Sequence, residues 1–470
     1  MKSIAGLILF YNRTMRYTYF RTTRILILLM SISSASLAQD SVKTLLLEDC
    51  IQLALSNSTA VLKGNNAVQS SGAQVLASYG QFLPDVSVGG AYAFTTGKNL
   101  LTVTAPTLVE SRRSNMTYQV VTSLNIFNGF YDQASLRSSL LNKEAAQLSL
   151  QRAKQQVTLD ITQSFLQVVL DQQIVEFAQQ NFQTSHQRED QLKALIDTGR
   201  KAASDLYQQQ SQTSMDKQFL IASENKLAND KIQLLQKLRI REDETNFRFT
   251  DLALAETNPA SGDQDEQALI KHALERRADL KSSQLYQEAV KWNEKKFRSG
   301  YLPKVYLSAG AYVTAAHYNK LLINGTNQYP SEQRPLGTQL SDQLYGVVAL
   351  NASWTIFDKN YTRANVAIAK VASDNARIDY ENTNLQIVSE VRQAYGNYHT
   401  ALQQLENSRT GLIAAQKAFD SMNGRYAIGS ANFIELSNAQ INLLQSKQNN
   451  AQAAIDLYLQ QKTLDYYLGQ

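Results

Sequence analysis

The sequence predicts an α+β membrane protein in which long antiparallel coiled-coil helices stand beside a few β-strands, with the whole arrangement given twice. The first observation is that the stretch 131–198 contains neither glycine nor proline. The second is that its apolar spacing recurs at 391–419, and the third is a pair of alternating apolar segments before each long stretch. A helix of that length would extend about 100 Å, so it must pack lengthwise against other helices.

The N-terminus reads as a secretory signal peptide that covers residues 1–38. Four arginines precede a short apolar run, Ile25 to Met30, and Ser36 and Ala38 place small side chains at a cleavage site. A transmembrane anchor is the alternative, but the run is well short of the roughly 20 residues needed. Residues 1–38 hold one Lys, four Arg and no acid, so cleavage lowers the formal charge from +5 to 0. We therefore expect no nucleic-acid partner.

The rest of the chain divides into two structural repeats, 39–240 and 266–470, with a charged connector at 241–265. Each repeat is expected to run helix, strand, strand, long helix and shorter returning helix. Its opening helix, at 44–79 in the first repeat, has apolar residues at helical spacing. The single cysteine, Cys50, excludes an internal disulfide framework.

Four strands are predicted where the apolar period changes from helical to alternating, at about 84–95, 117–127, 304–315 and 345–357. One face of the first is apolar, and the other is small or polar. Polar loops, 96–115 and 317–343, join the strands of each pair. A soluble strand pair is the alternative, but the polar face suits a wet lumen better than a core. Strands of about 10 residues fit a membrane barrel.

The four strands cannot close a barrel alone, and open sheet edges are not tolerated in lipid. We therefore expect a cyclic homo-oligomer in which each subunit supplies four strands.

The long helices carry seams of apolar residues spaced by seven, as a coiled coil requires. One constant offset in numbering relates the two seams and also relates Gly199 to Gly429, whereas the second loop is longer than the first. Because one inserted residue would rotate a seam away from its partner, this pattern indicates an internal duplication. The seams are Ile161, Val168, Val175 and Phe182 in the first helix, and Val391, Tyr398, Leu405, Leu412 and Phe419 in the second.

This order of elements resembles the TolC-type outer-membrane efflux proteins. The segment Leu47–Asn57 and the turn Arg425–Gly429, followed by Glu435, are similar to signatures of that family. The resemblance implies a homotrimer with a 12-stranded β-barrel in the outer membrane, continuing into a periplasmic α-barrel. It also implies an exit duct of a tripartite efflux or secretion system, whose partners are outer-membrane lipid, a periplasmic adaptor and an inner-membrane pump.

The resemblance further implies a periplasmic gate where the long helices turn. Tyr426 matches a family tyrosine that can donate its hydroxyl to a neighbouring tip, and Glu435 falls at an acidic position. Asn438 stands where relatives often have Asp. The alternative is that the acids are ordinary first-turn carboxylates, favoured by a helix N-terminus. The gate candidates are Tyr426, Gly429, Glu435 and Asn438 at the second turn, with Gly199 and Asp205 at the first.

Aromatic residues near the strand ends are expected to form an interfacial girdle, with core packing as the alternative. They are Tyr118, Phe127, Trp354 and Phe357.

The four histidines are scattered and lack metal-ligand spacing, so we expect neither an enzyme nor a cofactor. A non-transporting structural coiled-coil protein of the envelope is the alternative function. The strands beside each long helix argue against it.

Overall fold

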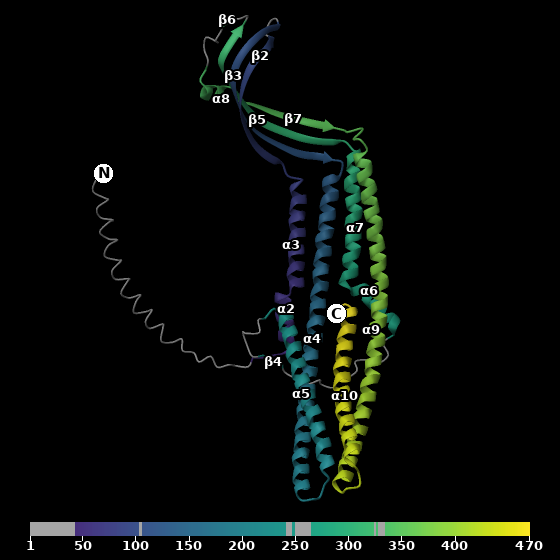
Figure 1. Ribbon diagram of the computed structural model, residues 1–470. Coiled ribbons are helices and arrows are strands. Elements are labelled where there is room, and N and C mark those ends of the chain that lie inside the picture. The colour runs from purple at the N-terminus through teal and green to yellow at the C-terminus, as the bar shows by residue number, and fades with distance from the viewer. Residues whose placement is uncertain (1–42, 103–105, 241–246, 250–264, 324–325, 328–333) are drawn as a thin grey trace, which may run out of the picture.

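The computed structural model describes residues 43–102, 106–240, 247–249, 265–323, 326–327 and 334–470. The predicted signal peptide lies outside them, as does most of the connector. The molecule is elongated, with a β-sheet at one end and helices running away from it (Figure 1). No described helix contains an apolar segment of the length that a membrane span requires.

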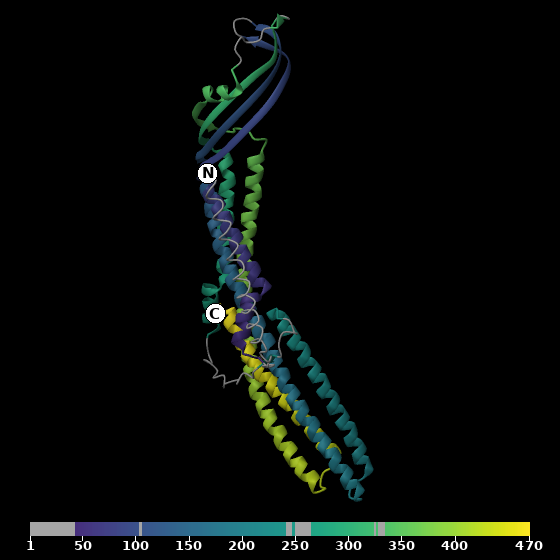
Figure 2. The same ribbon diagram turned by 90° about the vertical axis from the view of Figure 1, so that its left-hand side faces the viewer.

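Two helical hairpins form the far end of the molecule. Their long arms, α4 (Tyr131–Asp197) and α9 (Tyr361–Ala427), have 67 residues each, and their returning arms are α5 (Ala203–Leu238) and α10 (Phe433–Tyr467). Figure 2 shows the tips of the two hairpins ending close together, at the end of the molecule far from the sheet. The elements of the two halves recur in the same order, and the internal duplication stays a prediction.

The seams are buried mainly in the half of the helices nearer the sheet. Ile161, Val168 and Val391 are buried, whereas the other six seam residues are half-buried. The helices that precede the strands pack in that half, where α3 (Thr59–Gly80) packs on α4, and α7 (Ala278–Arg298) packs on both α4 and α9. The main core therefore surrounds the middle of α4.

The predicted single helix at 44–79 is wrong, because the chain breaks at Ser58 into α2 (Leu47–Asn57) and α3. The Ser58 hydroxyl accepts a hydrogen bond from the Ala60 amide at 3.3 Å and so begins the second helix. The second half has a matching break, after α6 (Glu266–Arg276). Beside α2, β1 (Lys43–Leu45) pairs in parallel with β4 (Phe247–Phe249), a strand inside the predicted connector.

The sheet is antiparallel, with the order β2, β3, β5 and β7, and a short β6 (Thr326–Asn327) pairs with the end of β5. The predicted loop at 96–115 is wrong, because β2 and β3 stay paired as far as Thr102 and Pro106. The fourth strand ends at 353, before the predicted 357, because β5 begins opposite Ser353 and offers no earlier partner. The long strands are β2 (Asp85–Thr102), β3 (Pro106–Asn128), β5 (Lys304–Ile323) and β7 (Tyr345–Ser353).

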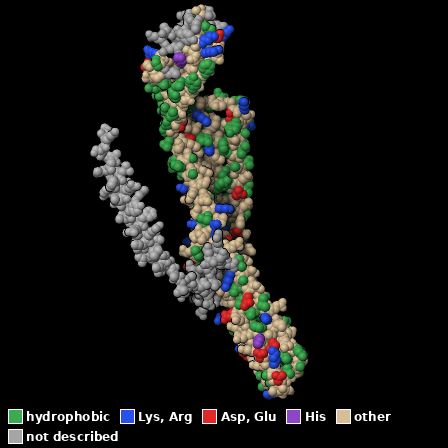
Figure 3. All heavy atoms as spheres, turned by 60° about the vertical axis from the view of Figure 1, so that its left-hand side comes forward, with side chains coloured by type: hydrophobic (Ala, Val, Ile, Leu, Met, Phe, Trp, Pro, Cys, Tyr) green, Lys and Arg blue, Asp and Glu red, His purple; other side chains and the backbone are tan. Residues whose placement is uncertain are grey.

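One face of this sheet exposes apolar side chains, visible as a green band below the upper end in Figure 3. Val88 is 79% exposed and Val348 is 75% exposed, although neither carries a polar group. Most of the paired residues on the opposite face are small or polar, such as Ser87, Gly89 and Gln119, although Val121 also lies there. An apolar face of this size without a protein cover is uncommon in a soluble monomer.

Candidate functional site

The two hairpin tips turn at glycines whose backbone is left-handed. Gly199 has φ +68° and Gly429 has φ +78°, and an added Cβ would meet no atom within 4 Å at either position. Backbone conformation alone therefore calls for glycine at both tips. Each turn closes when the amide just beyond the glycine donates to a carbonyl five positions earlier, as Ser430 does to Arg425 at 2.8 Å.

Tyr426 lies on the last turn of α9 and faces the other hairpin. Its hydroxyl is buried and has no hydrogen-bond partner among the described residues. The Lys201 ammonium lies 4.6 Å from the centre of its ring, and both residues line a cavity of about 330 Å³ together with Arg188. Burial and the Asp205 carboxylate raise the pKa of Tyr426, so it remains a protonated donor. The structure thus places Tyr426 beside Lys201 of the other hairpin, within the electrostatic influence of Asp205.

Glu435 serves as a helix cap in this structure. Its carboxylate accepts from the Asn432 amide at 3.0 Å, while the Asn432 side chain accepts from the Glu435 amide at 2.9 Å. This reciprocal pair starts α10 and is a capping box. Asn438 is exposed one turn further along α10, and Asp205 occupies the first turn of α5. The carboxylate and amide at 435 and 438 are three positions apart and so share one helix face.

A buried polar cluster behind the tips joins three helices, and sequence reasoning missed it. Ser185 of α4 donates to the Asp216 carboxylate of α5, and the Gln209 side chain donates to the Ser185 carbonyl at 3.0 Å. Arg188 of α4 donates to Gln440 of α10, whose amide in turn donates to Asn181 at 2.7 Å. We call these residues the tip cluster. It ties the two hairpins together near their free ends.

The sequence carried a signal for this cluster. Buried positions on α4 recur at heptad spacing, at Asp171, Ala178, Ser185 and Leu192. A serine and a carboxylate in such a series must find polar partners, because a buried polar group without one is costly. Polar residues in a heptad series therefore marked the tip cluster.

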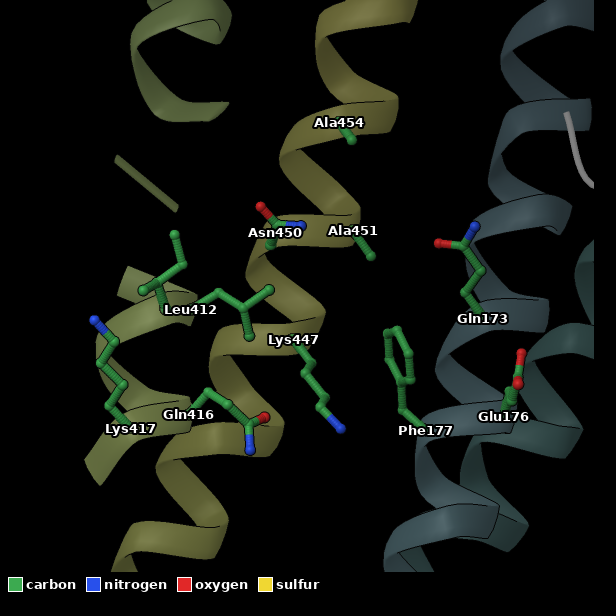
Figure 4. Close-up of a pocket in the computed structure, with 11 residues that line it drawn as sticks. Gln173, Glu176, Phe177, Leu412, Gln416, Lys417, Lys447, Asn450, Ala451 and Ala454 are labelled. Atoms are coloured by element: carbon green, nitrogen blue, oxygen red, sulfur yellow. The ribbon is translucent and has the colours of Figure 1, made fainter. Parts of the chain in front are cut away.

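Beyond the tip cluster, toward the sheet, the hairpins leave a groove of about 740 Å³ between them. Figure 4 shows Phe177 of α4 pointing toward Ala451 of α10, with Lys447 reaching into the space between the helices. Leu412, half-buried in the predicted seam, lines the opposite wall. The groove explains why that seam residue is only partly covered.

Three of the four predicted girdle residues lie at the helix-proximal end of the sheet. Phe127 makes an edge-to-face contact with Phe130, with ring centres 5.2 Å apart, and Trp354 donates to the Tyr301 carbonyl at 3.1 Å. Phe357 is 74% exposed nearby in sequence. Tyr118 lies apart from them, further back along β3 and opposite Gly90. The structure therefore does not place the four residues at the same height along the strands of the sheet.

The buried carboxylate of Asp216 should make the stability of the folded protein depend on pH. Burial raises its pKa, although Ser185 donates to the carboxylate. Because the folded-state pKa exceeds that of the unfolded chain, the protein loses stability as pH rises through the raised value. We expect Asp216→Asn to raise the free energy of unfolding at pH 7, with a gain that shrinks as the pH falls through that raised pKa. Denaturant unfolding monitored by helical circular dichroism at several pH values measures this.

The matched control for this variant is Glu224→Gln on the same helix, where the side chain is exposed. We expect this control to have little effect at either end of the pH range. A destabilised Asp216→Asn at pH 7 would contradict the interpretation, since it would mean that the charged carboxylate stabilises the tip cluster.

Comparison with known proteins gives the same family in sequence and in structure. A sequence profile described as "Outer membrane efflux protein" matches residues 50–238 and 269–470. The outer membrane protein TolC of Escherichia coli (strain K12) is 21% identical over 394 residues, covering 82% of this chain and 74% of that protein.

Two solved structures share the fold. The CmeC outer membrane channel of Campylobacter jejuni matches with a TM-score of 0.76 and 16% identity, covering 90% of this chain and 85% of that one. The outer-membrane channel OprN matches with a TM-score of 0.74 and 20% identity, covering 90% and 89%. The chain belongs to the outer membrane efflux protein family, as a TolC-like protein of the outer membrane.

Proposed function

We propose that three copies of this chain form the exit duct of a tripartite efflux or secretion system. The observation that carries the proposal is the sheet: one face exposes apolar side chains, the other is small and polar, and it continues into helices 67 residues long. Lipid would cover the apolar face, and water would fill the space behind the polar face. The family supports a channel rather than an enzyme.

The sheet edges support a closed ring of subunits. Neither outer edge, that of β2 nor that of β7, pairs with another strand among the described residues. Unpaired backbone groups are not tolerated in lipid. Three subunits that each give four long strands would form a barrel of twelve, in which β2 of one subunit pairs with β7 of the next.

The aromatic residues support two membrane interfaces rather than one. Tyr118 and Phe127 are about 30 Å apart along β3. Because the strands of a membrane barrel are tilted, the height between them across the membrane is smaller and about equals that of the apolar band. Tyr92 and Phe94, 63% and 58% exposed, accompany Tyr118. We infer that Tyr118 belongs to the outer girdle, and that Phe127, Trp354 and Phe357 belong to the periplasmic one.

The helical hairpins would cross the periplasm. A helix of 67 residues extends about 100 Å, and three subunits would arrange their hairpins as an α-barrel. The adaptor and the inner-membrane pump would then meet the tips at Gly199 and Gly429. Electrophoresis of detergent extracts and planar-bilayer recordings test the proposal: a heat-labile trimer with single-channel conductance supports it, and a water-soluble monomer or dimer without conductance contradicts it.

The topology makes a separate prediction. An epitope inserted between Ile323 and Thr326, at the end of β5, should bind antibody on intact cells, because that end of the sheet faces outside. An epitope inserted after Gly429 should bind only after the outer membrane is permeabilised. Labelling of intact cells at the second position, or at neither, would reverse or refute this orientation.

The gate at the tips also makes a prediction. We expect Tyr426→Phe to favour the open channel, because the family pattern has this tyrosine donate its hydroxyl to a neighbouring tip, and phenylalanine has no hydroxyl to donate. We expect Glu435→Ala to reduce cation preference by removing a ring of carboxylates. Conductance and reversal potential in planar bilayers measure both effects. Unchanged values in both variants would place the gate elsewhere.

Because Glu435 also caps α10, Glu435→Gln is the better-matched variant. It keeps an acceptor for the Asn432 amide and removes only the charge. Loss of cation preference in Glu435→Ala but not in Glu435→Gln would assign the effect to the capping box rather than to the carboxylate ring.

A further inference from the structure

Basic residues gather on the outer half of the sheet, in the region that the sequence predicted as a loop. Lys98 of β2 stands opposite Glu110 of β3, and Arg112 of β3 stands opposite Lys320 of β5. The Lys320 ammonium lies 2.9 Å from a Glu110 oxygen, which confirms that the side chains share one face. We call Lys98, Arg112 and Lys320, with Glu110, the outer basic cluster.

The outer basic cluster lies on the apolar face of the sheet. The β2–β3 register runs without a shift from Val88 to Leu100, so alternate residues along β2 point to the same side. Phe94, 58% exposed, therefore shares a face with Lys98. The two residues are separated by about 13 Å along the strand. The cluster thus follows the apolar band along the same face, with the exposed Leu100 beyond it on β2, and Figure 3 shows blue side chains gathered at this end of the sheet.

The charges in this cluster do not balance. Across the full described lengths of β2, β3 and β5, the sequence has two acids, Glu110 and Asp85, and Asp85 lies at the opposite end. One carboxylate therefore serves three cations. Arg112 and Lys320 stand directly opposite each other, and like charges in that position destabilise a strand pair. An external anion would relieve this repulsion.

We propose that the outer basic cluster binds the phosphate groups of an outer-leaflet glycolipid of the lipid A class. The inference rests on the proposed function, in which the apolar face meets lipid. An acyl chain would lie against Phe94 and Val88, while the phosphate would meet Arg112 and Lys98, the two exposed cations. Guanidinium binds phosphate through paired hydrogen bonds, and basic residues beside a membrane attract anionic headgroups.

The test compares purified protein in nanodiscs of neutral phosphocholine lipid, titrated with fluorescent diphosphoryl lipid A or with its fully dephosphorylated form. The variant is the double substitution Lys98→Gln and Arg112→Gln, which keeps the Lys320–Glu110 pair. At about 1 kcal/mol for each basic residue near the surface, we expect the double variant to bind diphosphoryl lipid A about thirtyfold more weakly. Dephosphorylated lipid A should bind weakly to both proteins.

The matched control is the double substitution Arg200→Gln and Lys217→Gln, two exposed cations in the helical hairpins far from the sheet. It should bind like the wild type. Equal binding by the wild type and the Lys98/Arg112 variant, or equal binding of the two lipids by the wild type, would overturn the proposal. Displacement of lipid A by millimolar inorganic phosphate would also overturn it, by showing a site for the free anion.

Conductance of the same purified proteins, recorded in planar bilayers, separates this inference from the proposed function. A wild type that conducts but does not prefer the phosphorylated lipid refutes the lipid site and leaves the duct intact. A wild type that neither inserts nor conducts contradicts the duct itself, and with it the orientation on which the lipid site depends.

Discussion

Val391→Asp should abolish the assembled protein. Val391 is fully buried, and it packs with Ile387 and with Leu269 and Ile270 of α6 in the second core cluster. A carboxylate there would be unpaired in apolar surroundings, at a cost of several kcal/mol. Because a typical folded domain is stable by only about 5–15 kcal/mol, we expect little folded protein to accumulate. Measurements of the heat-labile oligomer on gels and of helical content by circular dichroism test this.

Gln393→Asp is the matched control for that variant. It introduces the same carboxylate slightly later on α9, where the side chain is exposed, so assembly should be near normal. If Val391→Asp also gave normal amounts of oligomer, the core cluster around Val391 would have to be hydrated or loosely packed.

Arg277→Ala should destabilise the helical part by about 3–5 kcal/mol, the range for breaking a buried ion pair. Arg277 is 3% exposed at the break between α6 and α7. Two of its nitrogens donate hydrogen bonds to the Asp279 carboxylate, at 3.0 Å and 2.5 Å, and a third donates to Glu390 of α9. Removing the guanidinium leaves two carboxylates without that partner. Denaturant unfolding of the purified oligomer measures the loss.

The ion pair between Arg277 and Asp279 also predicts how stability changes in acid. Burial alone would raise the pKa of Asp279, but hydrogen bonds and charge from Arg277 outweigh it and hold that pKa below the usual value. A depressed carboxylate pKa stabilises the fold above the unfolded-state value of about 4, and the contribution is lost as pH falls through the folded-state pKa. The wild type should therefore lose stability in acid more steeply than Arg277→Ala does.

Arg377→Ala is the control for Arg277→Ala. Its pair with Glu381 on α9 has a similar separation, 2.8 Å, but both side chains are about half exposed. Such a surface pair contributes about 0–1 kcal/mol. A comparable loss in the two variants would mean that burial of Arg277 has no energetic consequence.

The sequence predicted the long helices and their turns because their signals are local. A run without breakers between two glycines can be read residue by residue, and the left-handed backbone at Gly199 and Gly429 is the physical reason for those glycines. The strand ends were harder to predict. At 96–115 both faces of the hairpin are partly polar, so the alternation fades while the backbone pairing continues.

The opposite error occurred at Trp354 and Ile356. These residues keep the apolar alternation past the end of β7, but β5 supplies no partner beyond Lys304. Alternation reports which way side chains face, whereas a strand also requires a neighbour. In the same way, no local signal could show that Arg188 reaches Gln440, because this contact depends on how the two hairpins pack.

The two outer edges of the sheet differ in length, since β2 has 18 residues and β7 has 9. In the proposed ring of subunits, each edge could pair only over the length that the other offers, so the outer half of β2 would project as a crown beyond the closed wall. Substitutions in that crown would leave the pairing between subunits unchanged. This part of the chain would therefore be constrained by the proposed lipid contacts of Lys98 and Arg112 rather than by pairing between subunits, whereas the wall beneath it would be constrained by its neighbours.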